Sequence, residues 1–147
     1  MFQILTIKET TDLSSQTYTD ALTIRKEVFV TEQQVPLDLE IENEDVCIHF
    51  VLYDGNQAQA TVRLFPKKHG TYKVQRMAVS LAARKKGFGR EIMVYAEEFA
   101  KKNNGKRMIL GAQTQAIPFY ESLGYTVFGE EYLDAGIKHF DMEKEFR

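Results

Sequence analysis

The chain has 147 residues, of which 44% are hydrophobic and 27% charged, proportions that are usual for one globular domain with a substantial core. Nineteen basic and 21 acidic residues give a net charge of −2, which argues against a surface built for nucleic acid or anionic membranes. The first residues lack a basic region followed by an apolar block, and no stretch is long enough to span a membrane. We therefore expect a cytoplasmic protein without nucleic-acid or membrane partners.

The N-terminal third predicts a strand, a helix and an acidic loop. The strand covers residues 2–7, and capping side chains precede a helix that runs to about Thr31 with apolar residues at helical spacing. Arg25 lies within that apolar stripe, where it either packs its stem and reaches water or pairs with a carboxylate near a substrate. Six acidic residues alternate with apolar ones in the loop 32–45, so the loop could pack down and attract a cationic amine.

An antiparallel meander is predicted next. Strands at residues 47–53 and 58–65 are joined by a good hairpin turn at 54–57, and the second strand alternates apolar and polar residues. A third strand runs over residues 72–79. Cys47 is the single cysteine and lies in a β-prone run, so we expect a small buried side chain rather than a nucleophile or half of a disulfide.

A short basic loop with two glycines connects this third strand to an amphipathic helix over residues 91–102. Gly87 and Gly89 carry no Cβ, so the backbone can turn tightly and approach a ligand. The unpaired N–H groups at the start of the helix lie at the positive end of its dipole. The pattern predicts an anion site suited to a diphosphate, with added positive charge from Arg84, Lys85, Lys86 and Arg90.

The C-terminal third predicts a buried strand at 107–111, a helix at 114–123 and strands at 125–128 and 137–145. A strand, a crossover helix and another strand indicate one parallel pairing within an otherwise antiparallel sheet. Parallel neighbours that splay apart leave backbone groups available. An arm with its own amides could bind there as an added strand.

Two segments resemble the GNAT superfamily of N-acetyltransferases. Arg84-x-x-Gly87-x-Gly89 resembles the acetyl-CoA pyrophosphate loop, whose pattern is Gln/Arg-x-x-Gly-x-Gly/Ala. Residues 113–125 resemble the family's Asn-x-x-Ala-x-x-x-Tyr-Glu-x-x-Gly-Phe segment, with Gln113 where the family most often has Asn. A third set of matches, around residues 25–36, 49–51 and 136–142, resembles the YjcF-like and ElaA-like bacterial branch of the superfamily.

The resemblance implies an α/β (α+β) GNAT fold for residues 1–147 as one domain. Its sheet would be mixed but mostly antiparallel, with six to seven strands and about four helices, and splayed between strands 4 and 5. The implied activity is transfer of an acetyl group from acetyl-CoA, as co-substrate, to a primary amine, directly within a ternary complex. Metal catalysis is not expected, because the three histidines and one cysteine show no ligand spacing.

The resemblance also assigns roles to individual residues. Backbone N–H groups near Met77–Val79 would meet the thioester carbonyl, and Tyr120 would donate a proton to the departing sulfur. Glu40 is the preferred base among the acidic residues, while Glu42, Asp45, His49 and His139 remain alternatives. The expected coenzyme contacts are Met77, Ala78, Val79, Arg84, Lys85, Lys86, Gly87, Phe88, Gly89, Arg90, Gln113, Ala116, Phe119 and Tyr120. The expected acceptor contacts are Arg25, Glu42, Asp45, His49 and His139.

The sequence leaves the acceptor open between a small-molecule amine and a peptide or protein amine. Two other functions also stay open. One is a CoA-binding sensor or interaction protein without turnover, and the other is an acyltransferase that uses a longer acyl-CoA. GNAT proteins are often dimers, so a homodimer is an option.

Overall fold

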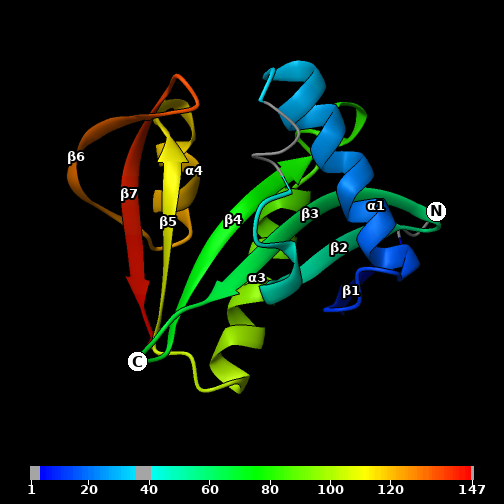
Figure 1. The fold of residues 1–147 in the computed structure, drawn as a ribbon, viewed down its shortest axis with the longest axis horizontal. Helices are drawn as coiled ribbons and strands as arrows, with labels where there is room; N and C mark the ends of the chain where they lie inside the picture. The colour runs from blue at the N-terminus through cyan, green and yellow to red at the C-terminus, as the bar shows by residue number, and fades with distance from the viewer. Residues whose placement is uncertain (1–3, 36–40, 147) are drawn as a thin grey trace.

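The computed structural model describes residues 4–35 and 41–146, which form one mixed sheet with helices on both faces (Figure 1). The seven strands lie in the order β1-β2-β3-β4-β5-β7-β6, which confirms the expected mixed sheet of six to seven strands. All neighbouring strands are antiparallel except β4 and β5. The strands are β1 (Leu5–Thr10), β2 (Ile48–Asp54), β3 (Gln57–Pro66), β4 (Thr71–Val79), β5 (Arg107–Gln113), β6 (Thr126–Asp134) and β7 (Ile137–Glu145).

The described residues form three α-helices together with shorter helical turns, consistent with the number of about four that the resemblance implied. The longer first helix divides into an α-helical part and a π-helical part, and Ser15 caps its start by accepting a hydrogen bond from the Tyr18 N–H at 3.2 Å. No helix in this part of the chain is long and apolar enough to cross a membrane. The helical elements are α1 (Gln16–Arg25), η1 (Lys26–Glu32), η2 (Glu44–Val46), η3 (Leu81–Ala83), α3 (Phe88–Lys102), η4 (Thr114–Ala116) and α4 (Ile117–Ser122).

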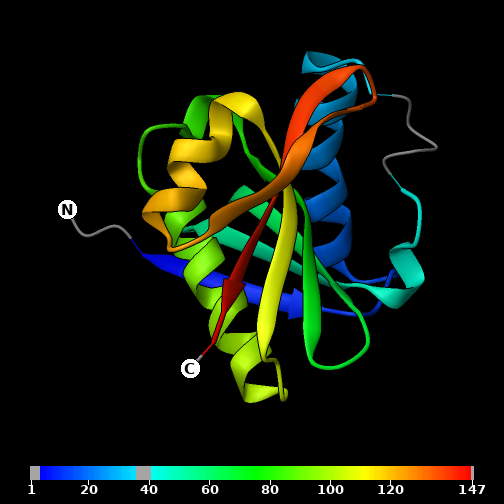
Figure 2. The same cartoon turned by 90° about the vertical axis from the view of Figure 1, so that its left-hand side faces the viewer.

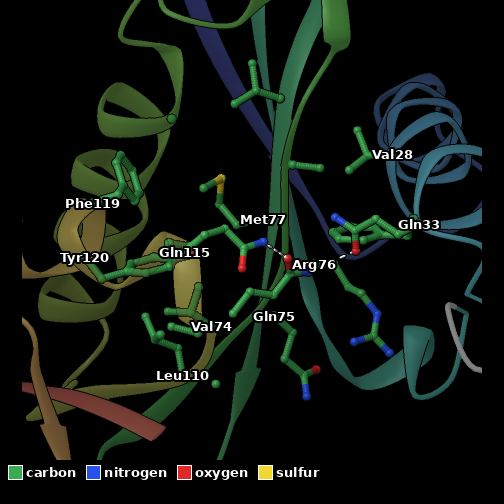
Figure 3. Close-up of a pocket in the computed structure, with 18 of the residues that line it drawn as sticks. Val28, Gln33, Val74, Gln75, Arg76, Met77, Leu110, Gln115, Phe119 and Tyr120 are labelled. Atoms are coloured by element: carbon green, nitrogen blue, oxygen red, sulfur yellow. Dashed lines mark hydrogen bonds between the residues drawn. The ribbon is translucent and has the colours of Figure 1, made fainter. Parts of the chain in front are cut away.

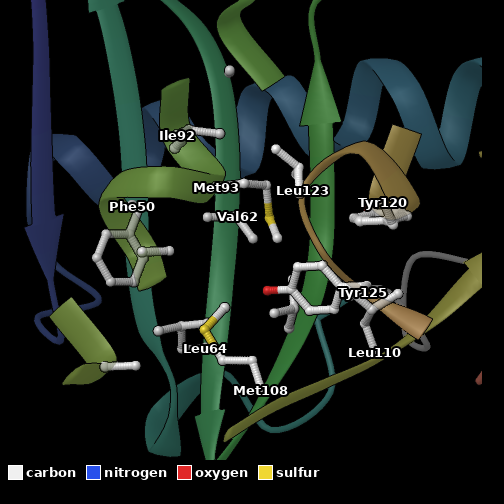
Figure 4. Packing of buried hydrophobic residues seen from close by; sticks show 14 of the residues in the cluster. Phe50, Val62, Leu64, Ile92, Met93, Met108, Leu110, Tyr120, Leu123 and Tyr125 are labelled. Carbon is white, nitrogen blue, oxygen red and sulfur yellow. The ribbon is translucent and has the colours of Figure 1, made fainter. Parts of the chain in front are cut away.

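Alternating residues of the central strands pack against different helices. On β2, Phe50 and Leu52 belong to the core beneath α3 and α4, whereas Val51 and Tyr53 pack against α1. Figure 2 shows helices on both faces of the sheet, and Figure 4 shows Phe50 within the larger core. Because side chains point to opposite faces of a strand, this pattern requires helices on both sides of the sheet. Fully burying one such side chain contributes about 1.5–3 kcal/mol to stability, so packing against the two helical layers stabilises the centre of the sheet.

Helix α3 begins earlier than its apolar periodicity predicted. It starts at Phe88 rather than at residue 91, because Gly87 caps it with a φ of +81° and its carbonyl accepts a hydrogen bond from the Glu91 N–H at 3.1 Å. Phe88 is buried in the main core. The basic, glycine-bearing loop is therefore shorter than expected, and the helix N-terminus lies within it.

The sheet opens between its fourth and fifth strands, as predicted (Figure 1). The parallel pairing of β4 with β5 covers only residues 71–74 of β4 and 107–110 of β5, after which the strands diverge. On its other edge β4 carries a bulge, because Ala78 lies opposite Thr61 while Gln75 lies opposite Arg63. Arg76, within that bulge, has a φ of +56°. The divergence and the bulge together shape one side of an opening in the sheet.

Candidate active site

A cavity of about 1090 Å³ occupies the opening between β4 and β5 (Figure 3). Its walls come from η1, β4, the loop at residues 84–90, β5, α4 and the β6–β7 turn. All of the predicted coenzyme contacts except Lys86 line it. Of the predicted acceptor contacts, Glu42 and His139 line it, whereas Arg25, Asp45 and His49 do not. Glu40, the preferred base, lies outside the described residues.

The loop at one end of the cavity has the backbone geometry of an anion site. Gly87 has a positive φ, and a Cβ at this position would meet no atom within 4 Å, so its backbone faces open space in the cavity wall. The first N–H groups of α3 follow at once, and Lys85 also adopts a positive φ of 67°. The backbone thus presents donors where the sequence predicts a diphosphate.

Arg84 of this loop is held by an acidic side chain from the other side of the cavity. Its guanidinium forms a bidentate pair with Glu32 at the end of η1, with Nη1–Oε2 and Nη2–Oε1 distances of 3.0 and 2.8 Å. The hydrogen bonds from Arg84 hold the pKa of Glu32 below its ordinary value. Glu32 lines the cavity, whereas in the sequence it stood out only as one of the acidic residues of the loop 32–45.

A chain of side-chain amides crosses the cavity next to this ion pair. The Gln113 amide donates to Gln33 Oε1 at 2.9 Å, and the Gln115 amide donates to Gln113 Oε1 at 2.5 Å. Figure 3 shows Gln33 reaching in from the side of η1 and Gln115 lying on the wall formed by α4. Gln113, predicted to contact pantetheine, therefore already bonds another amide that a coenzyme amide could replace.

Tyr120 lines the cavity but is only 8% exposed. Its ring packs edge-on against Phe119, with a centroid distance of 5.0 Å, and burial raises the pKa of its hydroxyl. Pro118 falls in the first turn of α4, where its missing N–H costs no helical hydrogen bond. The phenol stays protonated at neutral pH and can act as a proton donor.

His139 lines the cavity from β7, directly opposite Gln113 of β5. Its Nδ1 bonds the Ile137 carbonyl oxygen at 2.7 Å, and its ring stacks on Tyr132 with a centroid distance of 5.8 Å and an interplanar angle of 23°. The Tyr132 hydroxyl donates to Asp141 Oδ1 at 2.8 Å. Tyr132 was missed in the sequence, because β6 was expected to end at residue 128 and its long irregular pairing with β7 has no local signature.

Arg25 and His49 belong to a separate buried cluster on the α1 side of the sheet. Glu44 Oε1 pairs with Arg25 Nη2 at 2.7 Å, and Glu44 Oε2 pairs with Arg63 Nη1 at 2.9 Å. Burial alone would raise the pKa of Glu44, but the two guanidinium groups hold it below its ordinary value. His49 Nε2 bonds the Glu44 carbonyl oxygen at 3.0 Å. The cluster braces the segment that leads into β2, next to the cavity.

The cluster meets the cavity through one strand residue. Arg63 Nε donates to Gln75 Oε1 at 3.1 Å, and Arg63 Nη1 donates to the Glu42 carbonyl oxygen at 2.6 Å. Both Gln75 and Glu42 line the cavity. In the sequence, the only sign of this cluster was Arg25 within an apolar stripe. Its carboxylate partner, Glu44, was one of six acidic residues in the loop 32–45, and no local pattern set it apart from the others.

Comparison with known proteins gives one consistent family. A profile described as an acetyltransferase (GNAT) domain matches residues 10–146. The uncharacterised N-acetyltransferase YjcF of Bacillus subtilis is 43% identical over 128 residues, covering 86% of this chain and 91% of that protein. The crystal structure of Escherichia coli ElaA has a TM-score of 0.84 at 25% identity, covering 98% of this chain and 100% of the other.

The fold is also shared with a coenzyme complex. The structure of a Bacillus subtilis acetyltransferase in complex with CoA has a TM-score of 0.73 at 16% identity, covering 97% of this chain and 100% of that one. Both branch names that the sequence suggested, YjcF and ElaA, thus occur among the similar proteins.

Proposed function

Because this chain belongs to the GNAT acetyltransferase family and is an acyltransferase, we propose that it transfers acetyl from acetyl-CoA to a primary amine within a ternary complex. The observation that carries the proposal is the position of the cavity. It runs continuously from the basic glycine loop, through the gap between β4 and β5, to Tyr120 and the β6–β7 turn. A donor bound at the loop and an acceptor bound beyond the gap would meet there.

The donor would be held mainly by backbone groups. The N–H groups around Gly87 and the start of α3 would bind the diphosphate, and Arg84, Lys85 and Arg90 from the cavity wall would add positive charge. The pantetheine amides would lie along the separated parts of β4 and β5, with Gln113 as a side-chain partner. This arrangement suits any acyl-CoA, and acetyl is the acyl group that the family description favours.

The chemistry would be a direct attack of the amine on the thioester. The neutral amine nitrogen forms a bond to the carbonyl carbon and gives up one proton to a base, the carbon–sulfur bond breaks, and the departing thiolate takes a proton from the Tyr120 hydroxyl. Backbone N–H groups in the bulged part of β4, near Met77 and Ala78, would stabilise the negative charge on the carbonyl oxygen. Burial raises the pKa of Tyr120, so its hydroxyl is protonated at neutral pH and a proton is present when the sulfur leaves.

The acceptor would enter from the side of η1 and the β6–β7 turn. Acidic residues at this side, Glu42 and Asp134, would favour a cationic amine in the approach to the cavity. The opening suits a small amine or the end of a peptide chain.

The test is a panel of primary amines assayed with acetyl-CoA, with release of the free thiol as readout. The panel contains amine metabolites, polyamines, aminoglycosides, and peptides with a lysine or a free N-terminus. Thiol release that depends on one acceptor class supports the proposal. Tight CoA binding by calorimetry without release for any acceptor would instead support a sensor, and release only with a longer acyl-CoA would reassign the donor.

A further inference from the structure

His139 lies on the cavity wall beside a predicted coenzyme contact. In the antiparallel pairing of β5 with β7, His139 is directly opposite Gln113, and both residues line the cavity. Side chains of directly opposed residues lie on the same face of a sheet, with Cβ atoms about 5 Å apart. His139 is only 9% exposed. The imidazole is therefore sheltered and close to the place where pantetheine would end in the acyl group.

The hydrogen bond of His139 defines which of its nitrogens carries a proton. A carbonyl oxygen can only accept, so the 2.7 Å contact between Nδ1 and the Ile137 carbonyl requires a proton on Nδ1. In the neutral ring Nε2 then carries a lone pair. When a hydrogen bond to the backbone holds one imidazole nitrogen, the other nitrogen is commonly the one that reacts.

The surroundings hold this ring in one orientation. Tyr132 stacks on it from β6, and the Tyr132 hydroxyl is itself tied to Asp141. Gly111 makes room for this arrangement, because a Cβ at that position would overlap the Tyr132 hydroxyl. A side chain locked by a backbone bond and a stacked ring is prepared for proton transfer without reorganisation.

The other candidate bases among the described residues are less well placed. His49 lies outside the cavity, its Nε2 bonds the Glu44 carbonyl, and burial lowers its pKa. Asp45 is exposed and does not line the cavity. Glu42 lines the cavity, but its side chain is exposed to water.

We propose that His139 is the general base of the acyl transfer and that Nε2 takes the proton of the attacking amine. This inference rests on the proposed function. As the nitrogen–carbon bond forms, the amine proton passes to Nε2. As the carbon–sulfur bond breaks, the sulfur takes its proton from Tyr120, so the two proton transfers occur on opposite sides of the reacting carbon.

Several ionisable groups line the same cavity as His139 or lie beside it on β7. They are Tyr132 and Asp134 on β6, Asp141 and Lys138 beside it on β7, Lys73 and Arg76 on β4, and Glu42 ahead of η2. A pH profile must therefore be compared between matched variants rather than interpreted alone.

The experiment uses His139→Asn, because the Asn amide can still donate to the Ile137 carbonyl while the base nitrogen is lost. His69→Asn is the matched control, since His69 is exposed in the turn between β3 and β4. With the best amine of the panel, we expect His139→Asn to lower kcat/KM about 10²- to 10⁴-fold. We expect its CoA affinity to stay within twofold of the parent chain and the His69→Asn variant to keep full activity.

Two further readouts separate a base from a structural residue. The fall of kcat/KM at low pH that the parent chain shares with His69→Asn should be altered in His139→Asn, and added imidazole should restore turnover to His139→Ala. A His139→Asn variant with parental kcat/KM and pH profile would overturn the base role, as would a loss of CoA binding in step with activity. A parent chain that releases no thiol with any amine would overturn the proposed function itself, and the base role with it.

Discussion

Arg84 and Glu32 form a bidentate ion pair across the mouth of the cavity, with nitrogen–oxygen distances of 2.8 and 3.0 Å. Arg84 belongs to the loop proposed to bind the coenzyme diphosphate, and Glu32 ends η1 on the acceptor side. Gln33, the next residue, accepts a hydrogen bond from the side-chain amide of Gln113 at 2.9 Å. The last residue of η1 and the residue that follows it thus bond two of the groups proposed to contact the coenzyme.

We expect Glu32→Gln to bind CoA about two- to fivefold more tightly than the parent chain. The substitution releases Arg84 and removes a negative charge close to the diphosphate, and a half-exposed ion pair is worth only about 0.2–1 kcal/mol. Calorimetry at low salt measures the change, which should shrink as salt is added. Glu98→Gln, exposed on α3, is the control. Weaker binding by Glu32→Gln would mean that the ion pair supports the loop rather than competing with the ligand.

Tyr120→Phe should reduce kcat about a hundredfold or more while leaving CoA affinity unchanged, because it removes a proton donor and keeps the packed ring. Tyr125→Phe is a close control. Tyr125 is also buried, packs edge-on against Tyr120 and lies outside the cavity, and its hydroxyl has no hydrogen-bond partner among the described residues. Steady-state thiol release and calorimetry measure the two properties. Equal turnover in both variants would remove Tyr120 from the mechanism.

Gly87→Ala should weaken CoA binding severalfold and lower the free energy of unfolding by about 1–2 kcal/mol. The left-handed conformation at φ +81° is strained for alanine, and the new methyl group would enter the space proposed for the diphosphate. Gly55→Ala imposes a similar strain at φ +62° in the β2–β3 turn, also in open space. We expect the same loss of stability from Gly55→Ala but parental CoA affinity. A similar loss of affinity in both variants would point to a global cause.

Buried His49 should make the protein less stable in mild acid. Burial lowers the pKa of its imidazole in the folded state below the unfolded value of about 6.5. Between these two pKa values the unfolded chain binds more protons, so the free energy of unfolding falls as the pH drops below about 6.5, by up to about 1.4 kcal/mol per pH unit. Denaturant titrations from pH 7.5 to 5 should show a smaller slope for His49→Gln than for the parent chain. His69→Asn should retain the parental slope.

Glu44→Gln should lower the free energy of unfolding at pH 7 by about 3–5 kcal/mol, because Arg25 and Arg63 would be left in a buried site without their shared carboxylate. The pKa of Glu44 is depressed by these guanidinium groups against the opposing effect of burial, so its contribution is present above about pH 4.3 and is lost as the pH falls further. Denaturant unfolding measures the loss. Glu130→Gln, exposed on β6, should change stability by less than about 0.5 kcal/mol.

The strands of the sheet could be predicted because the sequence signals that specify them are local. Alternation on β3, the hairpin turn before it and the glycine loop before α3 each depend on a few neighbouring residues, and all occur where they were expected. Errors were confined to ends: α3 starts three residues early because Gly87 caps it, and β6 continues to Asp134 because its pairing with β7 sustains it. End positions depend on partners that lie elsewhere in the chain.

The sequence by itself determined the family, because two motifs resemble GNAT segments, and that resemblance implied the opening between strands 4 and 5 that the structure confirms. The coenzyme loop at residues 84–90 is a prediction from a short local pattern of glycine and basic residues. Only the tertiary structure decided which polar residues meet. It placed Arg25 and His49 around Glu44 instead of on the cavity wall, and it placed His139 beside Gln113 and Tyr132. Such contacts join residues up to 80 positions apart, as between Gln33 and Gln113, and they depend on strand register and helix packing that no local pattern encodes.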